Sequence, residues 1–394
     1  MVQKILFTWS VHVSLGEGLR KTRGGRICCN TVQPRRTMVR RKGLIRCLVV
    51  DGDGEFREDV FGDRGLGVGL DEEIPPSGDA PSRSWVPVGR LRDFLKEKEN
   101  ELTTVEEAIG SRPDHPLNLR LAFVADEMSM GVSRALKRSD GALAVIPQVK
   151  RIELPSSPDE PGERITDLPD VYEKTLELQV AGADAVLIHT DQVRYGCSLG
   201  DFQSVTKRML RAGSRPGFDG APPLIRGDFI FHPLQLAEAA ELGANAVILI
   251  AGLCLPDLEN LLNSAALMGL EAIVECHTEL ERDIALELGA TILYLSNLDY
   301  STCRITPGRA LSLRTEVPDW IVTVAGGGIR TASECWEYLD AGFDAVVMGR
   351  IFMQTRRANA LIAEIQSRRR DVSQRFFENF GFDESDEQRL RGML

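Results

Sequence analysis

The chain has 394 residues, 43% of them hydrophobic, and a formal net charge of −11. This length suffices for one large core or two modest ones, and it accommodates a single barrel of about 250 residues with extensions. No run of 18 or more apolar residues occurs, so the sequence predicts no membrane span. Residues 1–50 carry eleven Lys and Arg against one acid, Glu17, giving +10 there and −21 for the remainder. This acidic remainder argues against nucleic acid as the main partner, because phosphate contacts need clustered cations.

Cysteine and histidine patterns indicate no metal site. The eight cysteines lack C-x-x-C spacing, and several stand inside apolar stretches, which favours reduced structural cysteines. The five histidines show no i, i+4 pairing that would place two ligands on one helix face. His189 and His277 follow apolar runs, where we expect a satisfied hydrogen bond rather than a metal ligand.

Residues 1–50 are rich in Arg and poor in acids, with a moderate supply of Ser and Thr. This composition is typical of an organelle transit peptide, and a solvated basic arm is the alternative. We expect the plastid stroma as the destination, with the mitochondrion or the cytoplasm as alternatives. Residues 51–87 are dense in Gly, Asp, Glu and Pro and short of large apolar residues, so we predict a disordered linker there.

Organised structure is expected over residues 88–366, followed by a tail, residues 367–394, that either forms a short outer helix or stays loose. It begins with an amphipathic helix over residues 91–110 and a second helical stretch over residues 119–138. The predicted strands are residues 142–149, 185–189, 224–226, 246–251, 272–276, 292–296, 321–325 and 345–348. The predicted helices between and after them are residues 171–180, 202–210, 234–242, 258–268, 280–288, a weaker one near Ala310, 332–339 and 358–365.

Residues 222–253 show the repeating unit most clearly. A short apolar run is broken at Gly227, a helical stripe ends at Gly243, and residues 246–251 are apolar without alternation. Such strands suit a parallel sheet covered by helices, and Gly ends several of the helices as a left-handed C-cap. Eight units with right-handed connections predict a (β/α)8 TIM barrel with an N-terminal helical extension. A doubly wound open sheet is the alternative, but no G-x-G-x-x-G follows the first strand.

In such a barrel the reacting groups lie on the loops that follow the strands. After the predicted seventh and eighth strands stand three glycines, Gly326-Gly327-Gly328, and then Gly349 with Arg350 behind it. Glycines let backbone N–H groups approach a phosphate, and the start of the following helix would face it. We therefore predict phosphate binding by Gly327, Gly328, Gly349 and Arg350, with tight turns alone as the alternative.

The residues at the strand ends resemble a known family. They are Gln148-x-Lys150-Arg151, Arg226-x-Asp228-Phe229-Ile230, residues 248–251, residues 273–277, Ser296-Asn297-x-Asp299, residues 324–329 and Gly349. Over residues 119–353 the chain is similar to indole-3-glycerol phosphate synthase. The resemblance implies ring closure and decarboxylation of 1-(2-carboxyphenylamino)-1-deoxyribulose 5-phosphate in tryptophan biosynthesis, without a cofactor. It implies catalysis by Lys150 and Glu275, and substrate binding by Arg226, Asp228, Phe229, Ser198, Ser296 and Asn297.

The chain departs from the family's pattern where protons are transferred. The family's general acid is a lysine at the position of Gly227, and a first-strand glutamate is replaced by Gln148. The family's Ser-Pro-Ser after the first-strand lysine is disturbed, an Asn is replaced by Ser296, and a Ser-Glu-Ser-Gly reads Ala325-Gly326-Gly327-Gly328. Losing a general acid typically forfeits roughly 10² to 10⁴ in rate.

Three hypotheses therefore stay open. In the first, Lys150 tuned by Glu275 supplies the missing acid in an active synthase; the alternative for these two residues is a mutually neutralising pair. In the second, a catalytically silent barrel binds a phosphorylated small molecule or a protein partner, and Arg350 strengthens the anion site. In the third, the barrel serves another reaction of a phosphorylated sugar. The residue chemistry favours the second.

Overall fold

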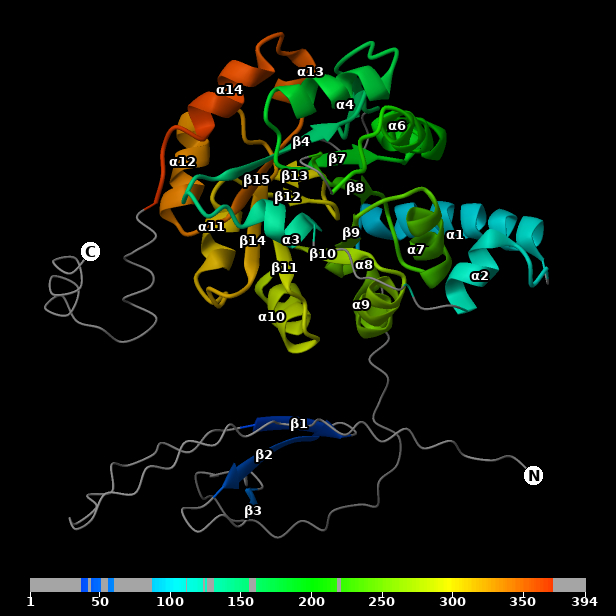
Figure 1. The fold of residues 1–394 in the computed structure, drawn as a ribbon, viewed down its shortest axis with the longest axis vertical. Helices are drawn as coiled ribbons and strands as arrows, with labels where there is room; N and C mark the ends of the chain where they lie inside the picture. Colours follow the sequence, from blue (N-terminus) through cyan, green and yellow to red (C-terminus); the bar gives the residue numbers. More distant parts are fainter. Residues whose placement is uncertain are drawn as a thin grey trace, which may run out of the picture. The chain divides into compact units, whose positions relative to one another are not determined.

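The computed structural model describes residues 37–41, 44–50, 56–59, 87–110, 112–122, 125, 131–155, 161–217 and 221–370 (Figure 1). The chain divides into two units, residues 1–80 and 81–394. In the first unit, β1 (Thr37–Arg41), β2 (Leu44–Val50) and β3 (Phe56–Asp59) form an antiparallel sheet in that order. These three strands are not among the predicted elements, and β3 lies within the stretch predicted as a linker. The transit peptide and the linker remain predictions.

Eight parallel strands of the second unit form a closed barrel, which confirms the predicted TIM barrel. In chain order they are β4 (Ala144–Val149), β7 (Val186–His189), β8 (Leu224–Gly227), β9 (Ala246–Ile250), β10 (Glu271–Cys276), β11 (Ile292–Ser296), β14 (Val322–Gly326) and β15 (Ala345–Met348). Each strand pairs with the next, and β15 pairs with β4 to close the ring. All eight predicted strands are present.

Helices alternate with these strands and surround the barrel (Figure 1). They are α4 (Val171–Val180), α6 (Leu199–Arg211), α7 (Pro233–Glu241), α9 (Leu258–Leu267), α10 (Glu279–Glu287), α11 (Arg309–Arg314), α12 (Ala332–Asp340) and α14 (Ala358–Ile365), which confirms the predicted helices. In the described residues no helix is both long and apolar enough to cross a membrane. Most of the predicted tail, residues 371–394, lies outside the described residues.

Short elements follow the carboxyl ends of several barrel strands. They are the hairpin β5 (Ile152–Glu153) with β6 (Glu163–Arg164), the hairpin β12 (Leu298–Asp299) with β13 (Arg304–Ile305), and the helices α5 (Gln192–Tyr195), α8 (Ala251–Cys254), η1 (Leu255–Asp257) and α13 (Arg350–Gln354). They build the mouth of the barrel, because all carboxyl ends of parallel strands face the same side.

Three N-terminal helices pack against the barrel. Helix α1 (Arg90–Ile109) agrees with the predicted helix, but the stretch predicted over residues 119–138 contains two helices, α2 (Pro116–Ala122) and α3 (Gly131–Leu136). Glu271, at the start of β10, accepts hydrogen bonds from the backbone N–H groups of Val132 and Ser133 at 2.6 and 3.0 Å. Helix α3 therefore closes the amino end of the barrel, opposite the mouth.

Helix α1 lies at the mouth. Its buried residues Leu91, Phe94 and Lys98 are three to four positions apart and so share one face. The ring of Phe94 lies 4.7 Å from that of Phe229, which follows β8. Because Phe229 follows a carboxyl end, α1 covers part of the mouth and brings Lys98 to it.

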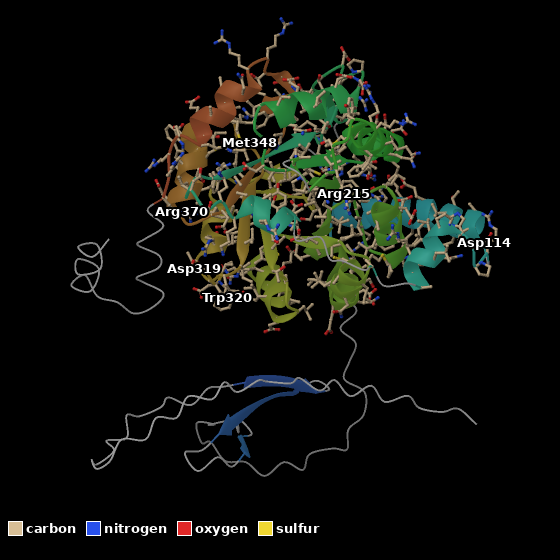
Figure 2. The ribbon with its side chains drawn as sticks, viewed as in Figure 1. Asp114, Arg215, Asp319, Trp320, Met348 and Arg370 are labelled. Atoms are coloured by element: carbon tan, nitrogen blue, oxygen red, sulfur yellow. The ribbon has the colours of Figure 1, made fainter. Side chains whose placement is uncertain are left out.

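The core has two layers, which explains the uninterrupted apolar strands. Leu143 and Val145 pack with the surrounding helices, while their neighbours Ala144 and Ile146 point into the barrel. Figure 2 shows side chains filling the space between the elements, with Met348 buried among them and Trp320, 76% exposed, at the edge. In a strand that is buried on both faces, an apolar side chain at every position adds to the free energy gained from burying apolar surface.

Candidate functional site

Two of the cavities at the mouth of the barrel are lined by predicted site residues. The larger, here called the mouth pocket, has a volume of about 220 Å³ and is lined by Lys150, Glu153, Glu163, Gly327, Gly328 and Arg350, among others. The smaller, here called the floor cavity, measures about 10 Å³ and is lined by His189, Gly227, Asp228, Phe229 and Glu275, among others. Gln148, Tyr195, Tyr294 and Tyr300 line both. The predicted phosphate residues therefore surround the mouth pocket, and the position of the missing lysine lies on the floor.

The loop after β14 exposes consecutive backbone N–H groups. Gly327 and Gly328 have φ values of +87° and +83°, in the region that residues with a side chain rarely adopt. Within the described residues, the N–H groups of Gly327, Gly328 and Ile329 donate no hydrogen bond. The Asn297 side chain fixes the loop by donating to the Gly327 carbonyl at 3.2 Å and to the Tyr338 hydroxyl at 2.8 Å. Successive N–H groups of this kind form an anion-binding concavity.

Two cations of the mouth pocket, Lys150 and Arg350, are paired with carboxylates of the β5–β6 hairpin, and a third, Arg330, also lines the pocket. Lys150 Nζ lies 2.7 Å from Glu153 Oε1. Arg350 donates to Glu163, with Nη1 3.2 Å from Oε1, and its Nε lies 3.6 Å from Glu153 Oε2. The hairpin therefore places two carboxylates beside the cations that a phosphate would use.

The predicted ion pair between Lys150 and Glu275 does not form. Lys150 is paired with Glu153, and the nearest cation to Glu275 is His277, whose Nε2 lies 3.4 Å from Glu275 Oε1. Glu275 faces the floor cavity, whereas Lys150 faces the mouth pocket. The β5–β6 hairpin makes the difference, because it brings a carboxylate to Lys150 from three residues along the chain.

His277 is held between two carboxylates. Its Nε2 faces Glu275 at 3.4 Å and its Nδ1 faces Glu281 at 3.3 Å. Burial alone would lower the pKa of His277, but hydrogen bonding and charge from the two carboxylates outweigh it and raise the pKa to about 9. At neutral pH this side chain is an imidazolium. Nδ1 has Glu281 as its partner, in line with the expected hydrogen bond, whereas Nε2 has an ion-pair partner but no hydrogen bond.

We expect the His277 Cε1–H NMR signal to titrate with a midpoint near pH 9. Because this pKa is raised above its value of about 6.5 in the unfolded chain, the ion pairs stabilise the fold fully below that pH. The stabilisation is lost as the pH rises through 9. Comparison with His277→Gln assigns the signal, and a midpoint below 6.5 would show that the carboxylates do not hold the proton.

An ammonium that the sequence analysis did not single out lies against Asp228. Lys98 Nζ is 3.0 Å from Asp228 Oδ1, 3.2 Å from Asp191 Oδ2 and 2.8 Å from Glu101 Oε2. Burial alone would lower the pKa of Lys98, but Asp228 and Asp191, followed by Glu101, raise it well above the usual range. One sequence signal could have indicated that Lys98 is buried: it lies on the same helix face as Leu91 and Phe94. Lys98 lines neither cavity, so it balances Asp228 instead of facing a ligand.

Several predicted substrate-binding residues serve the fold. Ser198 caps α6 and accepts from Asp201 N at 3.2 Å. Arg226 is 2% exposed and bonds to Thr190 and Asp228. Ser296 is fully buried and accepts from Leu298 N. These three side chains and Asn297 line neither cavity, whereas Asp228 and Phe229 line the floor.

The side chains missing from the floor have been replaced in space by neighbours. A Cβ built at Gly227 would lie 2.8 Å from Nδ1 of His189, its partner in the β7–β8 register. A Cβ built at Gly326 would collide with the hydroxyl of Tyr294 on the neighbouring strand β11. Neither glycine leaves an open hole. The replacement was not visible in the sequence, because it needs the lateral register of the strands.

Comparison with known proteins assigns the family. The family model described as indole-3-glycerol phosphate synthase matches residues 91–365. The chain belongs to the indole-3-glycerol phosphate synthase family. An enzyme of that name from Opitutus terrae is 34% identical over 235 residues, which are 59% of this chain and 84% of that one. Another from Chlorobium phaeovibrioides is 31% identical over 220 residues, 56% of this chain and 79% of that one.

Among solved structures, thiamine phosphate pyrophosphorylase from Pyrococcus furiosus aligns with a TM-score of 0.42 and 16% identity. The alignment covers 58% of this chain and 96% of that one. The family model confirms the resemblance noted in the sequence at the level of the indole-3-glycerol phosphate synthase family. Lys150, Glu275 and the glycines of the mouth lie inside the matched range.

Proposed function

We propose that this member of the indole-3-glycerol phosphate synthase family binds a phosphorylated small molecule in its mouth pocket and turns over the family's substrate at a strongly reduced rate. The observation that carries the proposal is the floor cavity. No Lys or Arg lines it, and His189 occupies the space beside Gly227 where the family's general acid would begin. Among the described residues, therefore, no ammonium lines the floor to protonate a carbonyl oxygen placed there.

The phosphate half of the proposal is supported by the opposite wall. Gly327, Gly328 and Ile329 present three N–H groups, and Lys150 and Arg350 line the same pocket. Main-chain donors with a nearby guanidinium are a favourable arrangement for a phosphate dianion. The β5–β6 carboxylates oppose binding until they are displaced from the two cations.

The available space favours a small ligand. Tyr195 and Tyr300 lie between the two cavities with their hydroxyls 3.3 Å apart, and the floor beyond them holds only about 10 Å³. The mouth pocket, at about 220 Å³, is smaller than the roughly 300–1,000 Å³ of sites for drug-sized ligands. A pentose phosphate suits this volume, whereas the same sugar carrying a carboxyphenylamino group would also need the adjoining cavity of about 390 Å³, which shares Leu154, Pro155 and Pro161 with the mouth pocket.

Two measurements test the proposal together. Turnover of 1-(2-carboxyphenylamino)-1-deoxyribulose 5-phosphate is expected to be roughly 10² to 10⁴ lower than for an authentic synthase, measured by indole fluorescence. Ribulose 5-phosphate is expected to raise the melting temperature, since a ligand that binds only the folded state stabilises it. Full synthase turnover would overturn the first half, and no stabilisation by any sugar phosphate would overturn the second.

Arg350→Gln is expected to weaken ribulose 5-phosphate binding about tenfold, which is one lost charge-assisted hydrogen bond at a partly exposed site. Glu163→Gln is expected to strengthen it about two- to fivefold, because a competing carboxylate is removed from Arg350. Calorimetric titration measures both. Arg208→Gln is the matched control. Arg208, on α6, also pairs with two carboxylates, Asp170 and Glu173 at the start of α4, and it lines neither cavity. Equal affinity in all three variants would remove Arg350 from the phosphate site.

The plastid stroma is proposed as the location of the protein, on the strength of the basic residues 1–50. Fusion of residues 1–87 to a fluorescent protein tests this directly. Plastid import supports the proposal, and mitochondrial or cytoplasmic fluorescence identifies the alternative.

A further inference from the structure

Two buried acid–base atoms on the wall of the floor cavity have no hydrogen-bond partner. They are Nδ1 of His189 and Oε1 of Glu275, on residues that are 5% and 2% exposed. Buried polar atoms are almost always hydrogen-bonded, so each exception in a native protein requires an explanation. Both residues lie at the carboxyl-end side of their strands, where barrel enzymes place their chemistry.

The position of His189 is set on three sides. The amide nitrogen of Gln148 lies 2.5 Å from His189 Nε2, and the ring of Tyr195 stacks on the imidazole at 3.7 Å. On the third side the glycine at position 227 makes room for the ring. With the amide N–H donating to Nε2, the imidazole proton is on Nδ1, which has no partner of its own.

The charge state of His189 fits a hydrogen-bond donor. Burial, helped by the nearby Lys150 ammonium and only partly offset by Asp228 and by the Gly227 backbone, lowers the pKa of His189 to about 3. The imidazole is therefore neutral across the physiological range and donates through one N–H. A neutral imidazole can polarise a carbonyl oxygen without bringing a full charge into a dry cavity.

We propose that His189 and Glu275 form a proton-transfer pair for a phosphorylated ketose that carries no aromatic group, with His189 as the donor to the carbonyl oxygen. The inference rests on the proposed phosphate site, which would hold the phosphate of the same ligand. The carbonyl end reaches the floor by replacing the contact between the Tyr195 and Tyr300 hydroxyls. The carbonyl end then meets His189 Nδ1 as hydrogen-bond donor and Glu275 Oε1 as base. Neither atom has a hydrogen bond, although Glu275 Oε1 is ion-paired with His277 Nε2 at 3.4 Å.

The step balances without a further reactant. Glu275 takes the proton from the carbon beside the carbonyl, and the electron pair of that C–H bond becomes the new C=C bond. The carbonyl oxygen becomes an enolate oxygen and accepts a hydrogen bond from His189 Nδ1–H. Return of a proton from Glu275 to carbon reverses the step, and in D₂O the returned proton is a deuteron.

The test is deuterium exchange into ribulose 5-phosphate in D₂O, followed by proton NMR, with binding of the same compound measured by calorimetry. The wild-type protein is expected to exchange the protons beside the carbonyl. His189→Leu, His189→Gln and Glu275→Gln are expected to slow exchange by about 10² or more while changing the Kd less than threefold. His115→Gln is the matched control and is expected to leave exchange unchanged, because His115 directly precedes α2 and lines neither cavity. Near-UV circular dichroism checks that each variant is folded. If His189→Leu does not fold, His189→Gln and Glu275→Gln decide the test.

Each other outcome overturns the inference in a distinguishable way. Binding without exchange by the wild-type protein removes the proton-transfer pair and leaves the phosphate site standing. Exchange that persists in both folded His189 variants removes His189 from the reaction. Absence of binding removes the proposed phosphate site and this inference with it.

Discussion

Combining Gly227→Lys with His189→Ala is expected to raise turnover of 1-(2-carboxyphenylamino)-1-deoxyribulose 5-phosphate by about 10² or more, whereas Gly227→Lys alone is expected to leave it at the wild-type level. The reason is space. A side chain at position 227 begins 2.8 Å from His189 Nδ1 and 3.1 Å from Leu187 Cδ1, so a lysine added alone meets the imidazole and cannot extend into the floor cavity. Removing the imidazole opens that path and also enlarges the small cavity.

Four proteins decide the matter: wild type, each single variant and the double variant, all measured at saturating substrate. His189→Ala alone supplies space without an acid and is expected to show no gain. If Gly227→Lys alone restores turnover, His189 does not block the position. If the double variant is folded and binds the substrate but stays inactive, the missing lysine is not what limits the chain.

Lys98→Met is expected to lower the free energy of unfolding by about 3–5 kcal/mol, the usual cost of removing one partner of a buried ion pair. Asp228 is 6% exposed and Asp191 is 1% exposed, and Lys98 lies within 3.2 Å of both. Burial would raise the pKa of Asp228, but Lys98 and Arg226 hold it well below its usual range. Without the ammonium, two buried carboxylates keep only their remaining partners, and urea unfolding followed by circular dichroism measures the loss.

Lys96→Met, on the exposed side of the same helix, is the matched control and is expected to change stability by less than about 0.5 kcal/mol. In the double variant Lys98→Met with Asp228→Asn, the losses are expected to sum to less than the two single values, because the charge left unpaired by the first change is removed by the second. Equal stability of Lys98→Met and Lys96→Met would mean that the buried network contributes nothing.

These two predictions concern residues that the sequence treats very differently. Gly227 was recognisable as the site of a missing acid, because a strand and the residues after it can be aligned with a family pattern. His189 and Lys98 were not recognisable as its neighbours. His189 meets Gly227 through the lateral register of β7 and β8, and Lys98 meets Asp228 through the docking of α1, 130 residues earlier in the chain.

The pairing of charges was also beyond the sequence. Lys150 directly follows β4 and Glu275 is near the carboxyl end of β10, which made a pair between them reasonable. Lys150 pairs with Glu153 because the β5–β6 hairpin folds back over the mouth. Glu275 pairs with His277 because of the turn after β10. Coulomb energies change steeply over a few ångströms, so partners follow loop geometry more than they follow position along the chain.

The sequence by itself determined the eight strands, the helices between them and their closure into a barrel, since apolar runs recur eight times and glycine ends several of the helical stripes between them, and both are local signals. It also determined which side of the barrel carries the polar strand ends. Only the tertiary structure decided which side chains occupy the space beside Gly227 and Gly326, and which charges meet at the mouth. Those contacts join residues far apart in the chain. Because protein interiors are packed almost as densely as crystals, the space left by a missing side chain is filled by a neighbouring one, and only the fold determines which residue is the neighbour.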